Sequence, residues 1–164
     1  MHITISGPRD VQRDRVFKPH FFHTMFTRYL EPFADSRFYI GGARGTDTMA
    51  LIWLMKNTIC HIEVVVPFEL SEQPVEARKA VAQCVRSRTF GKRITVTQLQ
   101  MKGWGSRAHH IRNEYMIDRS ELLIAFPFSP IEEERSGTWS AVRYAERIGR
   151  PHMIVPITSV ADNV

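Results

Sequence analysis

Short hydrophobic runs alternate along the chain with segments in which hydrophobic residues recur at helical spacing. Several runs are rich in β-branched residues and hydrophobic at successive positions, a pattern typical of strands covered on both faces. We predict strands at residues 2–6, 38–40, 62–68, 94–99, 122–126 and 153–157. We predict helices at residues 19–30, 47–57, 74–88, 107–119 and 138–148, the last ended by Gly149.

This alternation predicts an α/β fold with a doubly wound, mostly parallel sheet and helices on both faces. We expect the strands at 62–68 and 122–126 to be central. The chain has 164 residues, 43% of them hydrophobic, and shows no linker or repeat. We therefore expect a single domain over residues 1–164. Sheets of this class bind their ligands at the carboxyl ends of the strands.

Charge and cysteine content narrow the choice of partner and compartment. The 22 basic and 17 acidic side chains give a net charge of +5, which favours nucleotides, nucleic acid or acidic surfaces as partners. The two cysteines, Cys60 and Cys84, form no CxxC pair, so we expect neither a disulfide framework nor a metal site. No hydrophobic run approaches the roughly 18 residues that span a bilayer. We expect a cytoplasmic protein without a membrane partner.

Large aromatic side chains are concentrated on the first predicted helix. Phe21, Phe22 and Phe26, together with Trp53 of the second helix, exceed what one helix face needs. We therefore expect a homo-oligomer.

The first candidate loop, Ser6-Gly7-Pro8-Arg9-Asp10, directly follows a predicted strand. Gly7 lets the backbone turn sharply, and Arg9 has a planar guanidinium that suits an anion. The alternative is a plain surface turn with a solvated arginine.

The second candidate loop, residues 41–47, joins a strand to a helix through three glycines. Gly42 and Gly45 permit close backbone approach, and the N–H groups at the following helix start suit a phosphate. We expect Arg44 to contact that phosphate; in the alternative, it ties the loop to a carboxylate such as Asp10 or Asp47. Thr46 and Asp47 are candidates both for ligand contact and for capping the helix.

Two further candidate segments lie at helix starts. Arg112 and Asn113 come early in the fourth predicted helix and are candidates to face a ligand. Ser136, Gly137 and Thr138 open the fifth, where capping and phosphate binding are compatible. The chain has neither a Walker A lysine nor a GxGxxG pattern, so we expect no ATPase or dinucleotide chemistry and no cofactor. We predict that all these loops form one anion pocket at the carboxyl edge of the sheet.

Taken in order, these segments resemble the SLOG superfamily, from Ile3 to Pro156. Residues 6–10 are similar to the GSRD start of its YspA-like branch, residues 41–47 to the GGARGAD loop, and residues 112–116 to the RN..M helix. The run SGTWSAVRYAERIGRPHMIVP is similar to the ending of the DprA (Smf) branch. The resemblance implies a Rossmann-like fold and a nucleotide-type or single-stranded DNA ligand over the loops.

A third branch, the Lonely Guy phosphoribohydrolases, carries a catalytic glutamate in a PGGxGTxxE motif, where this chain has Ala141. Asn113 also replaces the lysine of the arginine-lysine pair. N-glycoside hydrolysis needs a carboxylate at the scissile bond. We therefore expect a module that binds a nucleotide-derived ligand, ADP-ribose-like or cyclic, as a sensor or sequestering protein. The alternatives are DprA-like binding of single-stranded DNA, supported by basic residues between 78 and 93, and a nucleotide N-glycosidase.

Overall fold

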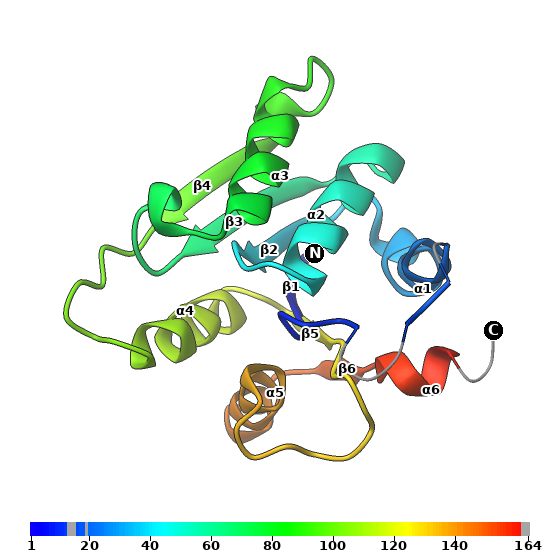
Figure 1. The fold of residues 1–164 in the computed structure, drawn as a ribbon, viewed down its shortest axis with the longest axis vertical. Coiled ribbons are helices and arrows are strands. Elements are labelled where there is room, and N and C mark those ends of the chain that lie inside the picture. The colour runs from blue at the N-terminus through cyan, green and yellow to red at the C-terminus, as the bar shows by residue number, and fades with distance from the viewer. Residues whose placement is uncertain (13–15, 19, 162–164) are drawn as a thin grey trace.

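The computed structural model describes residues 1–12, 16–18 and 20–161. Its centre is a single sheet of six strands in the order β4-β3-β2-β1-β5-β6 (Figure 1). Every neighbouring pair is parallel, so the predicted α/β class with a doubly wound, Rossmann-like sheet is confirmed. The strands are β1 (His2–Ser6), β2 (Arg37–Gly41), β3 (His61–Val66), β4 (Ile94–Gln98), β5 (Leu122–Ala125) and β6 (His152–Ile154).

Helices connect the strands and cover both faces of the sheet. They are α1 (Phe21–Leu30), α2 (Thr46–Asn57), α3 (Val75–Arg86), α4 (Arg107–Asp118), α5 (Gly137–Arg147) and α6 (Ile157–Ala161). Short 3-10 turns lie at Glu31–Phe33, Leu70–Glu72 and Gly91–Arg93. Within the described residues, no helix has the length and apolar character needed to cross a membrane.

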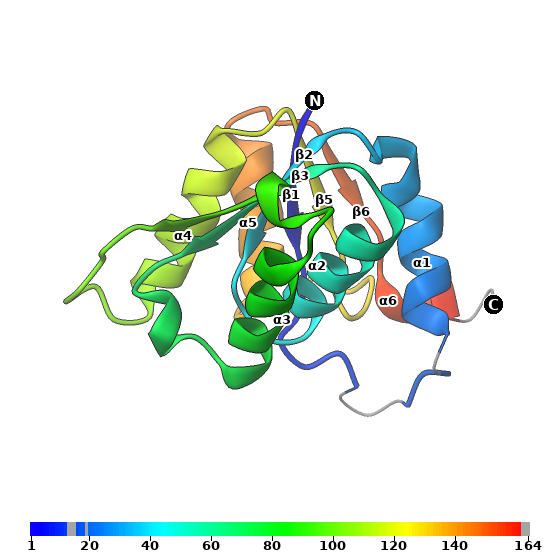
Figure 2. The ribbon, with the colours of Figure 1, turned by 90° about the horizontal axis from the view of Figure 1, so that it is seen from above.

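The direction in which the chain adds successive strands to the sheet reverses once, and the candidate site lies where it reverses. From β1 the chain moves outward through β2 and β3 to β4, and then returns to add β5 on the other side of β1. Right-handed connections that lead in opposite directions place their helices on opposite faces. Accordingly α1, α2 and α3 cover one face, and α4 and α5 the other (Figure 2). The crevice at such a switch point, here between β1 and β5, is the usual ligand site of open α/β sheets.

Side chains of alternate strand residues build the two cores. Ile3 and Ile5 of β1 and Ile124 of β5 pack with the α1–α3 layer, whereas Leu123 and Ala125 of β5 pack against α5. All five are fully buried. Burial on both faces explains why the strands are hydrophobic at successive positions.

The predicted elements agree with the structure except near some ends. Pro156 cannot donate to a strand ladder, so the sixth strand ends at Ile154 and Ile157 begins α6 instead. Gly149 has φ +68° and ends α5 as expected. Pro19, the predicted first residue of the first helix, lies outside the described residues. The two strands predicted to be central, β3 and β5, are interior strands that flank the innermost pair, β2 and β1. Hydrophobicity shows that a strand is covered on both faces, but it does not give the position of that strand in the sheet.

The aromatic side chains behind the expected homo-oligomer are buried within the chain itself. The side chains of Phe21, Phe22, Phe26 and Trp53 are all buried. Phe26 packs edge-on against Phe126 with ring centroids 5.6 Å apart. Because the body of the protein already covers these rings, they form no exposed aromatic surface for contact with a second copy. These rings therefore do not support the expected homo-oligomer.

Candidate functional site

A pocket of about 420 Å³ opens at the carboxyl ends of β1 and β5, where the winding reverses. Four segments line it: the end of β1 with its loop, the loop before α2 with the first turn of that helix, one side of α4 with the residue before it, and the start of α5. The lining residues are Ile5, Ser6, Gly7, Pro8, Arg9, Asp10, Ala43, Asp47, Ser106, His109, His110, Arg112, Asn113, Met116, Arg135, Ser136, Gly137 and Thr138.

The loop after β1 is locked to the start of α2. Both the N–H and the hydroxyl of Thr46 donate to the carbonyl of Pro8, at 3.1 and 3.2 Å. A Cβ on Gly7 would lie 2.5 Å from the Thr46 side chain, and a Cβ on Gly45 would lie 2.5 Å from the Pro8 and Arg9 carbonyl oxygens. Gly45 also has φ +77°. These two glycines therefore let two loops touch through their backbones.

Gly41, the last residue of β2, makes room for an arginine. A Cβ at this position would lie 1.4 Å from Nη1 of Arg112. The Arg112 side chain thus reaches from α4 across the end of β2, where Nη1 donates to the carbonyl of Val65 at 3.5 Å. Its Nε is buried and has no hydrogen-bond partner among the described residues.

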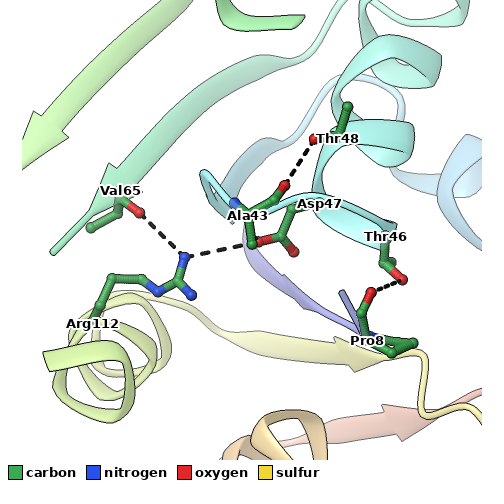
Figure 3. Close-up of polar contacts among 7 residues, drawn as sticks. All are labelled: Pro8, Ala43, Thr46, Asp47, Thr48, Val65 and Arg112. Atoms are coloured by element: carbon green, nitrogen blue, oxygen red, sulfur yellow. Dashed lines mark hydrogen bonds and ion pairs between the residues drawn. The ribbon is translucent and has the colours of Figure 1, made fainter. Parts of the chain in front are cut away.

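Arg112 and Asp47, which both line the pocket, form an ion pair (Figure 3). Nη1 lies 3.8 Å from Oδ2, and the two side chains are only 7% and 8% exposed. The Asp47 carboxylate also accepts the N–H of Ala43 at 3.3 Å. Burial raises the pKa of Asp47 to about 7, against the lowering effects of Arg112 and the Ala43 N–H. Burial likewise lowers the pKa of Arg112, which the neighbouring Asp47 partly offsets.

The start of α5 is arranged as a helix N-terminus that faces the pocket. Ser136 is its N-cap, and its hydroxyl accepts the N–H of Trp139 at 3.3 Å. Gly137 is exposed, Thr138 is buried, and both line the pocket beside Arg135. Helix N-termini carry partial positive charge and attract phosphate groups. Of the two residues predicted as possible caps, Ser136 and Thr138, Ser136 is the cap.

The first turns of α4 supply the remaining wall. His109 and Asn113 line the pocket one turn apart. Burial, followed by the nearby charges of Arg9 and Arg112, lowers the pKa of His109 to about 4. Within the part of the chain that the structure describes, its Nδ1 is buried without a hydrogen-bond partner. The ring is therefore neutral near pH 7 and presents no charge to an anion.

The pocket gathers most of the predicted site residues, but not those in the middle of the second loop. Gly42 is buried, with Cγ1 of Val66 2.7 Å from where its Cβ would stand. Gly45 and Thr46 hold the two loops together. The N-cap residue of α2 is Gly45, and no side chain caps this helix end, so the expected cap at Thr46 or Asp47 is wrong. Arg44 is exposed, lies outside the pocket lining, and forms no ion pair with another described residue.

Sequence reasoning missed Arg135 and did not assign His109 to a ligand site. Arg135 directly precedes the predicted Ser136-Gly137-Thr138 segment, so its position beside a helix start was an available signal. His109 lies three residues before Arg112, which places the two on one side of a helix.

Several basic residues between 78 and 93 line a different and larger hollow, of about 990 Å³, between α2 and α3. Lys56, Arg78, Lys79 and Arg86 contribute to it, whereas Arg93 lies over the ring of Phe90, 4.6 Å from its centroid. This hollow lies away from the switch point and contains no buried polar group. We therefore take the smaller pocket as the candidate site.

No protein-family model matches the chain, and no curated protein sequence matches it. Solved structures that share its fold include two DNA processing proteins. DNA processing protein A from Helicobacter pylori, reported for its single-stranded DNA binding mode, has a TM-score of 0.66 and 18% identity, covering 95% of this chain and 65% of that one. DprA from Streptococcus pneumoniae has a TM-score of 0.69 and 14% identity, with 99% and 54% covered. The chain thus spans less than two thirds of either neighbour, and the likeness shows a Rossmann-like fold.

Proposed function

We propose that the chain binds single-stranded DNA and that the pocket at the switch point holds one phosphate of the strand. The charge of the pocket carries this proposal. Arg9 and Arg135 come from separate loops and line the same pocket as the N-terminus of α5. Guanidinium groups and free helix N–H groups are both strong donors to phosphate oxygens.

The ion pair inside the pocket supports phosphate binding by Arg9 and Arg135. Arg112 is engaged by Asp47 and the carbonyl of Val65, so its side chain is held in place within the protein. Arg9 and Arg135 are exposed. In this proposal the two exposed arginines contact the phosphate, while Arg112 fixes the floor on which it rests.

Two observations favour a strand over a free nucleotide. The Helicobacter pylori neighbour is a protein with a single-stranded DNA binding mode, and the same fold provides the same edge to this chain. The net charge of +5 also suits a ligand with several phosphates. We further propose that the chain belongs to the SLOG superfamily, as its ordered motifs and its Rossmann-like sheet support.

A small nucleotide-derived ligand, ADP-ribose-like or cyclic, is the second candidate. The pocket volume of about 420 Å³ favours it, because this lies within the range of small-molecule sites. In either case we propose binding without hydrolysis. Ala141 of α5, at the position of the glutamate in Lonely Guy enzymes, is 2% exposed and packs in the core against β5.

Fluorescence anisotropy with labelled oligo(dT), titrated at several salt concentrations, tests the proposal. We expect saturable binding whose affinity falls steeply with salt, because each neutralised phosphate releases counterions. Arg135→Ala should weaken binding about tenfold or more, whereas Arg28→Ala, a change of an exposed arginine in the last turn of α1, should not. Wild-type protein that ignores oligo(dT) but binds ADP-ribose would support the second candidate instead.

A further inference from the structure

Trp104 lies exposed in the loop between β4 and α4. Half of its surface, 50%, is open to solvent, whereas Trp53 and Trp139 are only 6% and 8% exposed. Exposed tryptophans are uncommon because the indole is large and mainly apolar. This ring therefore stands out as a surface that a ligand can cover.

The glycines on either side of Trp104 stand in open space. Gly103 and Gly105 flank it with φ values of +90° and +53°, and a Cβ on either would meet no atom within 4 Å. The N–H of Met101 attaches the loop to the body by donating to the carbonyl of Pro67 at 2.9 Å, and the N–H of Trp104 donates within the loop to the carbonyl of Met101 at 3.3 Å. The indole is thus not needed as an anchor for the loop.

Cationic side chains accompany the ring. The guanidinium carbon of Arg107 lies 5.7 Å from the Trp104 ring centroid, within the range of a cation–π contact. Lys102 is exposed two residues earlier in the same loop. An aromatic face with neighbouring cations is the combination by which proteins hold single-stranded nucleic acid, through base stacking and backbone attraction.

The ring also lies close to the candidate site. Ser106, two residues after Trp104, lines the pocket. Since consecutive Cα atoms are 3.8 Å apart, the two Cα atoms are separated by at most about 7.6 Å. A strand with one phosphate in the pocket can therefore bring a neighbouring base onto the indole.

From these observations we infer that Trp104 is a stacking platform for a base of the bound strand. This inference rests on the proposed function and adds a specific recognition residue to it. It assigns the phosphate to the pocket and the base to the loop, so a strand without bases should bind but should gain nothing from Trp104.

The test compares labelled oligo(dT) with an abasic deoxyribose-phosphate strand of the same length. We expect oligo(dT) to quench the tryptophan fluorescence of the wild type. We expect Trp104→Ala to abolish that quenching and to lower the affinity for oligo(dT) about fivefold or more, with Trp104→Phe in between. The affinity for the abasic strand should be unchanged. Ile59→Ala removes another exposed apolar side chain, 69% exposed, between α2 and β3, and should change neither affinity.

The outcomes separate the two proposals. Equal oligo(dT) affinity of the wild type and Trp104→Ala overturns the stacking role and leaves strand binding intact. Equal losses for oligo(dT) and the abasic strand also overturn it, because the ring would then act on the loop and not on a base. A wild type that binds neither strand overturns strand binding, and with it the stacking role. In that case, quenching of Trp104 by an unrelated apolar peptide would identify the loop as a protein-binding surface.

Discussion

Arg112 and Asp47 join the two faces of the molecule, with Nη1 of one 3.8 Å from Oδ2 of the other. Arg112 belongs to α4, which covers one face of the sheet, and Asp47 lies in the first turn of α2 on the other face. Their contact passes over the end of β2, where Gly41 leaves the necessary space. The pocket floor therefore depends on a charge pair that is almost wholly withdrawn from water.

Arg112→Met should lower the free energy of unfolding by about 3 kcal/mol, because it leaves the Asp47 carboxylate buried without its partner. Urea denaturation measures the loss. Asp47→Asn in the same chain removes the stranded charge, and the double variant should be more stable than the sum of the single losses implies. Strictly additive losses would show that the two side chains do not interact.

Gly41→Ala should destabilise the fold by about 2 kcal/mol, since the new methyl group would overlap the Arg112 guanidinium and displace it from Asp47. Gly137→Ala is the matched control for stability, because the new Cβ would have no neighbouring atom within 4 Å. Thermal unfolding of the two variants gives the comparison. A Gly41→Ala protein as stable as the control would mean that the Arg112 side chain can adopt another conformation without loss of stability.

The glycines show which structural features can be predicted from the sequence and which cannot. The strands, helices and parallel sheet follow from local hydrophobic period and turn residues, so they are predictable. A glycine in a strand-to-helix loop serves equally for contact with a ligand or with the chain itself. Gly42 and Gly45 pack against the chain, and nothing local in the sequence reveals this.

Arg112 illustrates the same limit for charged residues. Its helical position indicated a side chain near the ligand, and it does line the pocket. Its burial depends on Asp47 and Val65, which are distant in sequence and are brought to it by the order of the strands. Such pairing is a property of the assembled sheet.

Arg9→Ala and Arg44→Ala should differ in their effect on oligo(dT) affinity. Arg9 lines the pocket, so its loss should weaken binding about tenfold, the value of a charge-assisted hydrogen bond. Arg44 is exposed outside the lining, so its loss should weaken binding less. Anisotropy titrations measure both affinities, and unchanged melting temperatures exclude unfolding as the cause. A larger loss for Arg44→Ala would move the phosphate site to the loop before α2.

His109→Gln should change how stability depends on pH. The native state keeps His109 neutral down to a pKa of about 4, whereas an unperturbed histidine takes up a proton near pH 6.5. The unfolded chain therefore binds more protons between these values, and the wild type loses stability as the pH falls through that window. The variant lacks this contribution, so the wild type should lose more stability than the variant between pH 7.5 and pH 5. Parallel urea curves at the two pH values provide the test, and identical losses would contradict the lowered pKa.

The close contacts among Gly7, Gly45 and Thr46 make one wall of the pocket more rigid than the wall opposite. On the β1 and α2 side, backbone groups touch directly and share hydrogen bonds to Pro8, so this wall is already ordered before any ligand arrives. On the α4 side, Gly105 stands in open space just before the helix. We therefore expect more of the conformational entropy lost on binding to come from the loop before α4 than from the β1 and α2 side. Differences in dissociation rate between ligands should accordingly arise on the α4 side, while the opposite wall acts as a rigid template.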